Sequence, residues 1–142
     1  MSLMPQPSFS PDHIHPILVN FTAALLPASM ASDVAGRIFK KPSLHHAAWW
    51  MLLYAAAITP FTALAGLLWK KSVASGVDPA ILMTHQRLGI ALGCLFIVMA
   101  VWRWSIYSRN QSPGMTYISF GILVVVALIY QGTLGGVMAF GP

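Results

Sequence analysis

Four long apolar stretches, separated by short segments of charged and turn residues, make up most of the chain. They lie at about residues 16–36, 46–69, 79–104 and 115–139. Each is close to the length of about 20 residues that an α-helix needs to cross a hydrocarbon core of about 30 Å. Within a bilayer only helices and closed barrels satisfy the backbone polar groups, and these stretches are too long and too uniformly apolar for barrel strands. The pattern therefore predicts an all-α fold, a bundle of four transmembrane helices.

The composition favours a single integral membrane domain over residues 1–142. Only 8% of the residues are charged and 57% are hydrophobic, whereas roughly 25% of the residues in an ordinary soluble domain are charged. A soluble globule is excluded, and the lipid bilayer is the expected partner. The net charge of +5 comes from basic residues scattered in ones and twos. Because they form no basic stripe, no nucleic-acid partner is expected.

The basic residues of the loops predict the orientation of the chain. Five of them fall in the first and third loops: Arg37, Lys40, Lys41, Arg103 and Arg109. The second loop has Lys70 and Lys71. By the positive-inside rule, we expect both termini in the periplasm of a bacterial inner membrane. No lysine or arginine precedes the first apolar stretch, so we expect a permanent span rather than a cleaved secretory signal.

Several residues within the spans carry local predictions. Asp78 directly precedes the third span and is expected to cap its first turn. Pro27 and Pro60 fall near the middle of their spans, where a missing N–H predicts a kink. Asp33 is the only acidic residue within a predicted span, and Arg37 follows four residues later. This spacing predicts an i, i+4 ion pair on the helix surface.

Three of the five histidines fall on the predicted periplasmic side. His13 and His15 lie at the outer end of the first span, and His85 lies one to two turns into the third span from the same side. An intramembrane histidine can ligate haem iron, relay a proton or bind a quinone, and a hydrogen-bonded packing role is the alternative. His45 and His46 are interpreted as the solvated start of the second helix.

Two glycines give the third span a flat face below His85. Gly89 and Gly93 follow it at i+4 and i+8 and therefore share its side of the helix. Such a face allows close approach of a neighbouring helix, and equally allows a planar macrocycle to lie beside an axial histidine. Arg87 is expected to extend to the interface, where its guanidinium is a candidate partner for a haem propionate.

Residues 13–33 read HIHPILVNFTAALLPASMASD. This segment resembles a family of small four-span bacterial membrane proteins, domain of unknown function family 2231. Its members typically open with a His-Pro-x-x-Val-His-Phe-Pro motif and carry an aspartate about a dozen residues on. The positions that match this pattern are His15, Pro16, Val19, Phe21 and Asp33. The likeness continues through Gly66, Trp69, His85 and the final GTLGGVMAFG.

The resemblance implies a layout similar to that of four-helix b-type cytochromes and an occurrence beside redox modules, and therefore electron transfer. Two motif positions differ in this chain. The second histidine of the motif is Asn20 and its second proline is Thr22. If the family's second histidine is an axial ligand, that bond is absent here.

Two main functions remain open. The first is a b-type haem or quinone-interacting electron-transfer subunit of a larger membrane redox complex. Its one haem b would have His15 and His85 as iron ligands, with Gly89, Gly93 and Arg87 around the macrocycle. The second is a non-catalytic membrane anchor or assembly subunit without a cofactor. A small transporter is a third alternative, although no inverted repeat is evident. We expect no independent enzymatic activity, because HExxH, GxSxG and P-loop motifs are absent from the sequence.

Overall fold

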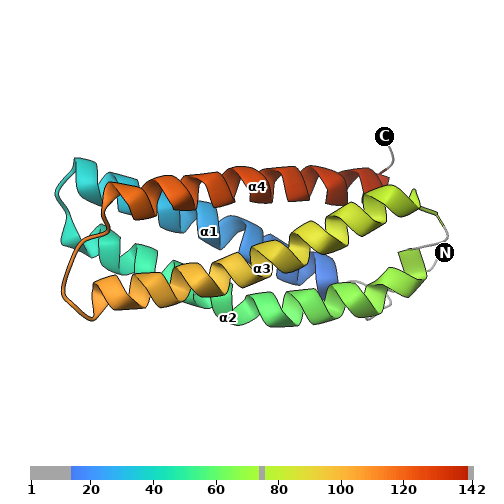
Figure 1. Ribbon diagram of the computed structural model, residues 1–142, viewed down its shortest axis with the longest axis horizontal. Helices are drawn as coiled ribbons and strands as arrows, with labels where there is room; N and C mark the ends of the chain where they lie inside the picture. Colours follow the sequence, from blue (N-terminus) through green and yellow to red (C-terminus); the bar gives the residue numbers. More distant parts are fainter. Residues whose placement is uncertain (1–13, 74–75, 141–142) are drawn as a thin grey trace, which may run out of the picture.

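The computed structural model describes residues 14–73 and 76–140, which form a bundle of four α-helices (Figure 1). In chain order the helices are α1 (Ile14–Ile38), α2 (Pro42–Val73), α3 (Pro79–Tyr107) and α4 (Met115–Phe140). The described residues form no strand. The predicted all-α four-helix bundle is confirmed, and each predicted span lies within one helix.

All four helices are long and apolar enough to cross a membrane. Their outward side chains are apolar as well. Phe61 is 65% exposed, Leu68 80%, Val101 64% and Leu123 67%. A surface of this kind is unfavourable in water because apolar area is driven out of it, and hydrocarbon chains remove that penalty. The chain is an integral membrane protein whose lateral surface is solvated by lipid.

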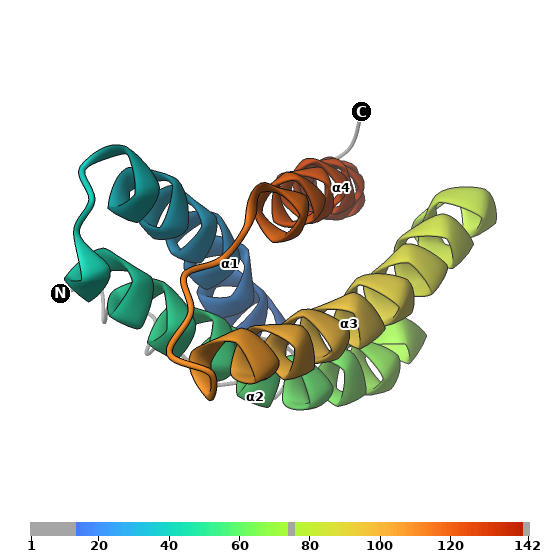
Figure 2. The same cartoon turned by 60° about the vertical axis from the view of Figure 1, so that its left-hand side comes forward.

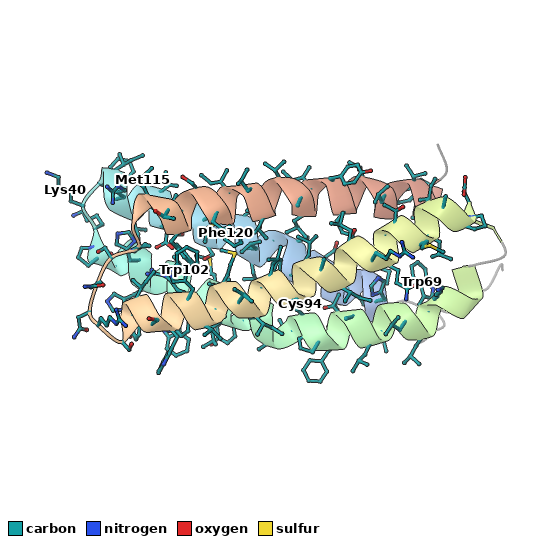
Figure 3. The ribbon with its side chains drawn as sticks, viewed as in Figure 1. Lys40, Trp69, Cys94, Trp102, Met115 and Phe120 are labelled. Atoms are coloured by element: carbon teal, nitrogen blue, oxygen red, sulfur yellow. The ribbon has the colours of Figure 1, made fainter. Side chains whose placement is uncertain are left out.

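The helices pack as a ring in chain order. α1 and α3 each contact α2 and α4 as their main neighbours, so α1 and α3 are diagonal across the bundle (Figure 2). The α1–α2 and α3–α4 connections lie at one end, and the start of α1, the α2–α3 connection and the end of α4 lie at the other (Figure 1). We call these the Lys40 end and the Trp69 end, after the residues labelled there in Figure 3.

Local sequence explains where α3 begins. The Oδ1 atom of Asp78 accepts a hydrogen bond of 2.7 Å from the backbone N–H of Ala80. This confirms the predicted cap, which satisfies one of the free N–H groups of the first turn. α1 and α2 continue as helices through Pro27 and Pro60.

The two turns at the Lys40 end each contain a residue in the left-handed region. Lys40 has a φ of 53° and Asn110 a φ of 52°. After Lys40, the N–H of Lys41 donates to the carbonyl of Gly36 at 3.0 Å. A left-handed residue followed by such a bond is a common way to end a helix and turn the chain sharply. The turns bring the start of α2 and the end of α3 to the same end of the bundle.

An apolar layer crosses the middle of the bundle. Each helix contributes one buried side chain to it: Leu26, Leu52, Phe96 and Val124, which are at most 3% exposed. On every helix the polar residues discussed below lie to either side of this layer in sequence. The layer therefore separates a polar cluster at the Lys40 end from another at the Trp69 end.

Candidate functional site

His15 is held firmly at the Trp69 end by three residues of α2. Its Nδ1 atom donates to the backbone carbonyl of Thr62 at 3.0 Å. Its ring lies against the indole of Trp69, with 5.6 Å between the ring centroids. A Cβ atom on Gly66 would stand 2.7 Å from the His15 Cε1 atom, so only glycine leaves room for this imidazole. The His15 ring therefore packs against Gly66 and Trp69, two of the positions at which the sequence resembles the family.

His85 lies on the diagonal helix α3, near its start at the Trp69 end. Its backbone carbonyl accepts a hydrogen bond of 2.9 Å from the Nε2 atom of Gln131 on α4. The His85 Nδ1 atom and the Gln131 Oε1 atom are both buried and have no hydrogen-bond partner among the described residues. The Trp69 end therefore holds two histidines and two unsatisfied polar atoms.

The predicted glycine face of α3 is covered by side chains of two neighbouring helices. A Cβ atom on Gly89 would lie 3.0 Å from the Gln131 Nε2 atom, and one on Gly93 would lie 3.1 Å from the Thr59 Cγ2 atom. Gly89 thus faces α4 and Gly93 faces α2. At these two glycines α3 approaches α4 and α2 closely, which is one of the two uses that the sequence allowed for this face.

Two other residues discussed for this site are exposed. Arg87 is exposed on α3, and Asn20, at the position of the second histidine of the motif, is exposed on α1. His13 lies outside the described residues. Among residues 14–73 and 76–140, no three His, Cys, Asp or Glu side chains gather in a way that could hold a metal ion.

A second polar cluster, which the sequence did not predict, is buried at the Lys40 end. The Oδ1 atom of Asp33 on α1 lies 2.8 Å from Nδ1 of His45 on α2 and 2.9 Å from Nη2 of Arg103 on α3. The same Arg103 nitrogen donates to the backbone carbonyl of His45 at 2.9 Å. Asp33 is 0% exposed and Arg103 2%. These contacts tie three helices together, and we call these residues the Asp33 cluster.

The fourth helix reaches this cluster through Tyr117. The Arg103 guanidinium carbon lies 5.8 Å from the centre of the Tyr117 ring, within the range of a cation–π contact. Three buried atoms here have no hydrogen-bond partner among the described residues: Asp33 Oδ2, Arg103 Nε and Tyr117 Oη. Each helix contributes one side chain to this arrangement, and the cluster retains unused hydrogen-bonding capacity.

Three sequence interpretations are corrected by this cluster. The predicted Asp33–Arg37 pair is wrong, because Asp33 faces the bundle interior while Arg37 is exposed. His45 is not solvated, since its side chain is only 13% exposed and contacts Asp33. Arg103 is not a loop charge, because α3 continues to Tyr107. A surface i, i+4 pair adds only about 0.2–0.5 kcal/mol, whereas a buried carboxylate requires a partner.

One signal in the sequence pointed to this cluster. Arg103 stands between two tryptophans at the end of the predicted third span, which places it inside the bundle and not in the loop. A buried guanidinium needs a counter-charge, and Asp33 is the only acidic residue within the predicted spans. The partner of Arg103 was therefore open to inference by charge balance.

Comparison with known proteins identifies a family. Residues 11–141 match the family described as "Predicted membrane protein (DUF2231)", which is nearly the whole chain. The resemblance noted from the opening motif is confirmed. No curated protein and no solved structure matches the chain.

Proposed function

The chain belongs to this family of predicted membrane proteins, and we propose that it is an electron-transfer subunit of a larger membrane redox complex. The proposal assigns one haem b to the Trp69 end, with His15 and His85 as the ligands of its iron. The family description names no activity, so the proposal rests on residues of this chain.

The hydrogen bond of His15 is the observation that carries the proposal. A backbone carbonyl can only accept, so the 3.0 Å contact with Thr62 requires the proton on Nδ1. In the neutral ring, Nε2 then keeps its lone pair. Metal-ligating histidines almost always donate their other ring N–H to a carbonyl, carboxylate or water in this way. His15 is thus in the tautomer that would let Nε2 hold a haem iron.

His85 supplies the second ligand from the diagonal helix. Its buried Nδ1 atom has no partner among the described residues, and leaving such an atom unsatisfied costs about 1–3 kcal/mol. A bound group at this end would relieve that cost. Arg87, exposed two residues further along α3, is suited to pair with a propionate at the membrane interface. When bound, a haem b supplies one-electron transfer to and from partner subunits.

Side chains already fill part of the space that a macrocycle would need. Gln131 covers Gly89 and would have to turn away, which costs its hydrogen bond to the His85 carbonyl. Thr59 covers Gly93, so that residue would remain a helix-packing position. The haem face would therefore extend along His85 and Gly89.

A cofactor-free membrane anchor or assembly subunit is the second candidate. The same packing favours it, because Gly89 and Gly93 already serve as close-approach positions for α4 and α2. Under this alternative His15 acts as a hydrogen-bonded packing residue between α1 and α2. The chain would then contribute stability to a partner complex and no electron carrier.

We further propose that the chain lies in a bacterial inner membrane with both termini in the periplasm. Four exposed basic residues lie at the Lys40 end: Arg37, Lys40, Lys41 and Arg109. Arg103 is not counted, because it is buried and paired with Asp33. Three basic residues belong to the Trp69 end: Lys70, Lys71 and Arg87. The end with more lysine and arginine is expected on the cytoplasmic side.

The test is a reduced-minus-oxidised absorption spectrum of the full chain purified from haem-replete membranes. We expect a Soret band that His85→Ala abolishes. Thr84→Ala is the matched control, because Thr84 is exposed and its hydroxyl donates only to the Ala80 carbonyl of its own helix. A Soret band that persists in His85→Ala would exclude His85 as an iron ligand. A folded wild-type protein that shows no Soret band after haem is added would exclude the haem and leave the anchor.

A further inference from the structure

We propose that the Lys40 end contains a binding site for a phosphate group, separate from the His15 and His85 site. A pocket of about 120 Å³ opens there between the start of α2, the end of α3 and the turn that follows it. Its polar lining consists of His45, His46, Arg103, Asn110, Gln111 and Ser112. None of its lining residues in the described chain is an aspartate or a glutamate.

Arg103 is the central group of this site. Two contacts hold its Nη2 atom, one with the Asp33 carboxylate and one with the His45 carbonyl, each at 2.9 Å. Its Nε atom is buried and has no partner among the described residues, although the side chain lines the pocket. A guanidinium fixed in place with a donor to spare is suited to an oxyanion, because the geometry is set before the ligand arrives.

The charge around the pocket selects an anion. Lys41 precedes the lining residue Pro42, and Arg109 precedes the lining residue Asn110, and both basic side chains are exposed. Among the described residues, Asp33 is the one acidic residue at this end, and it is already paired with His45 and Arg103. A negatively charged ligand therefore meets a surplus of positive charge.

The size of the pocket admits a phosphate group. A volume of about 120 Å³ is larger than a single bound water requires, and it leaves room for a tetrahedral oxyanion. The first turn of α2 adds the positive end of a helix dipole on one side. Basic pockets between transmembrane helices at a membrane interface are suited to phospholipid headgroups. A soluble phosphate offers the same oxygens, so the experiment separates the two sources.

The test uses the full chain in detergent after removal of bound lipid. Phosphatidylglycerol and phosphatidylcholine are added separately and bound lipid is counted by native mass spectrometry. Inorganic phosphate is titrated with tryptophan fluorescence as the readout. Trp49 is a suitable reporter, because it stacks on the pocket residue Tyr107 with 5.6 Å between ring centroids.

Two exposed substitutions add the same charge at different places. Ser112→Asp places a carboxylate in the exposed part of the lining, and Gly76→Asp places one at the Trp69 end, where no heavy atom of the described residues, its chain neighbours apart, lies within 4 Å of the new Cβ atom. Like-charge repulsion at contact distance is expected to weaken phosphate or lipid affinity at least about ten-fold in Ser112→Asp. Gly76→Asp is expected to change it less than about two-fold, because its charge lies at the opposite end of the bundle. Substitution of Arg103 itself is avoided because it would break the Asp33 cluster.

Each outcome has one meaning. Preference for phosphatidylglycerol over phosphatidylcholine, weakened by Ser112→Asp only, supports the site and identifies a lipid headgroup. Saturable binding of inorganic phosphate without lipid preference, weakened in the same way, supports the site with a soluble ligand. Absence of both kinds of binding, or equal effects of Ser112→Asp and Gly76→Asp, overturns the proposal. The result is independent of the haem spectrum, because the two sites lie at opposite ends of the bundle.

Discussion

Replacing Gly36 by alanine tests whether the contact between Asp33 and His45 stabilises the bundle. A Cβ atom there would stand 2.9 Å from the Cε1 atom and 3.0 Å from the Nδ1 atom of the His45 ring. Carbon atoms in favourable contact are about 3.5–4.0 Å apart, so the ring must move by about half an ångström or more. That movement acts directly on the 2.8 Å hydrogen bond between His45 and Asp33.

The magnitude follows from two opposing contributions. Loss of a hydrogen bond to a charged group costs about 1.5–3 kcal/mol. Alanine in place of glycine within a helix raises the free energy of unfolding by at most about 1 kcal/mol. We therefore expect Gly36→Ala to lower the free energy of unfolding by about 0.5–2 kcal/mol.

Gly132→Ala is the matched control for this prediction. No heavy atom outside its own helix lies within 4 Å of a Cβ atom at Gly132. The control should therefore gain up to about 1 kcal/mol from helix propensity alone. Equilibrium unfolding in mixed micelles of detergent and dodecyl sulfate, followed by circular dichroism, measures both variants. If Gly36→Ala stabilised the protein as much as Gly132→Ala does, the reasoning about His45 would be refuted.

Two further predictions concern orientation and packing. In a Cys94→Ala background, a membrane-impermeant thiol reagent should modify Gly76→Cys in intact cells and spare Ser43→Cys, and the reverse pattern would overturn the proposed orientation. Gly93→Leu should lower the free energy of unfolding by at least about 1–3 kcal/mol, because a Cβ atom at Gly93 already lies 3.1 Å from the Thr59 methyl carbon. Unchanged unfolding in that variant would mean that this face of α3 is not packed.

The number and the approximate limits of the helices could be predicted because they depend on the hydrophobicity and charge of individual residues. A run of apolar residues is costly to leave in water, and a charge is costly to place in hydrocarbon. Asp78 could likewise be assigned as a cap from its position before a proline. None of these predictions required knowledge of which side of a helix meets which neighbour.

The Asp33 cluster could not be predicted in the same way, because it depends on the rotation of each helix about its axis. Asp33 and Arg103 are 70 residues apart, and only the packing of α1 near α3 brings them to 2.9 Å. The apolar pattern gave little guidance, since lipid-facing and core-facing positions are both apolar in a membrane bundle. Spacing along a single helix therefore favoured Arg37, the wrong partner for Asp33.

Polar contacts are what specify the rotation and order of these helices. Lipid tails are as apolar as leucine, so burial of apolar area does not favour one helix face over another within the bilayer. At the Lys40 end, rotating α1 would remove Asp33 from Arg103 and leave a buried charge unpaired, a loss of about 3–5 kcal/mol. At the Trp69 end, the same rotation would break the bond from His15 to Thr62. Two polar contacts on one helix, one on each side of the apolar layer, thus fix α1 in a single orientation. The contacts at one end of the bundle therefore help to position the side chains that a ligand would meet at the other end.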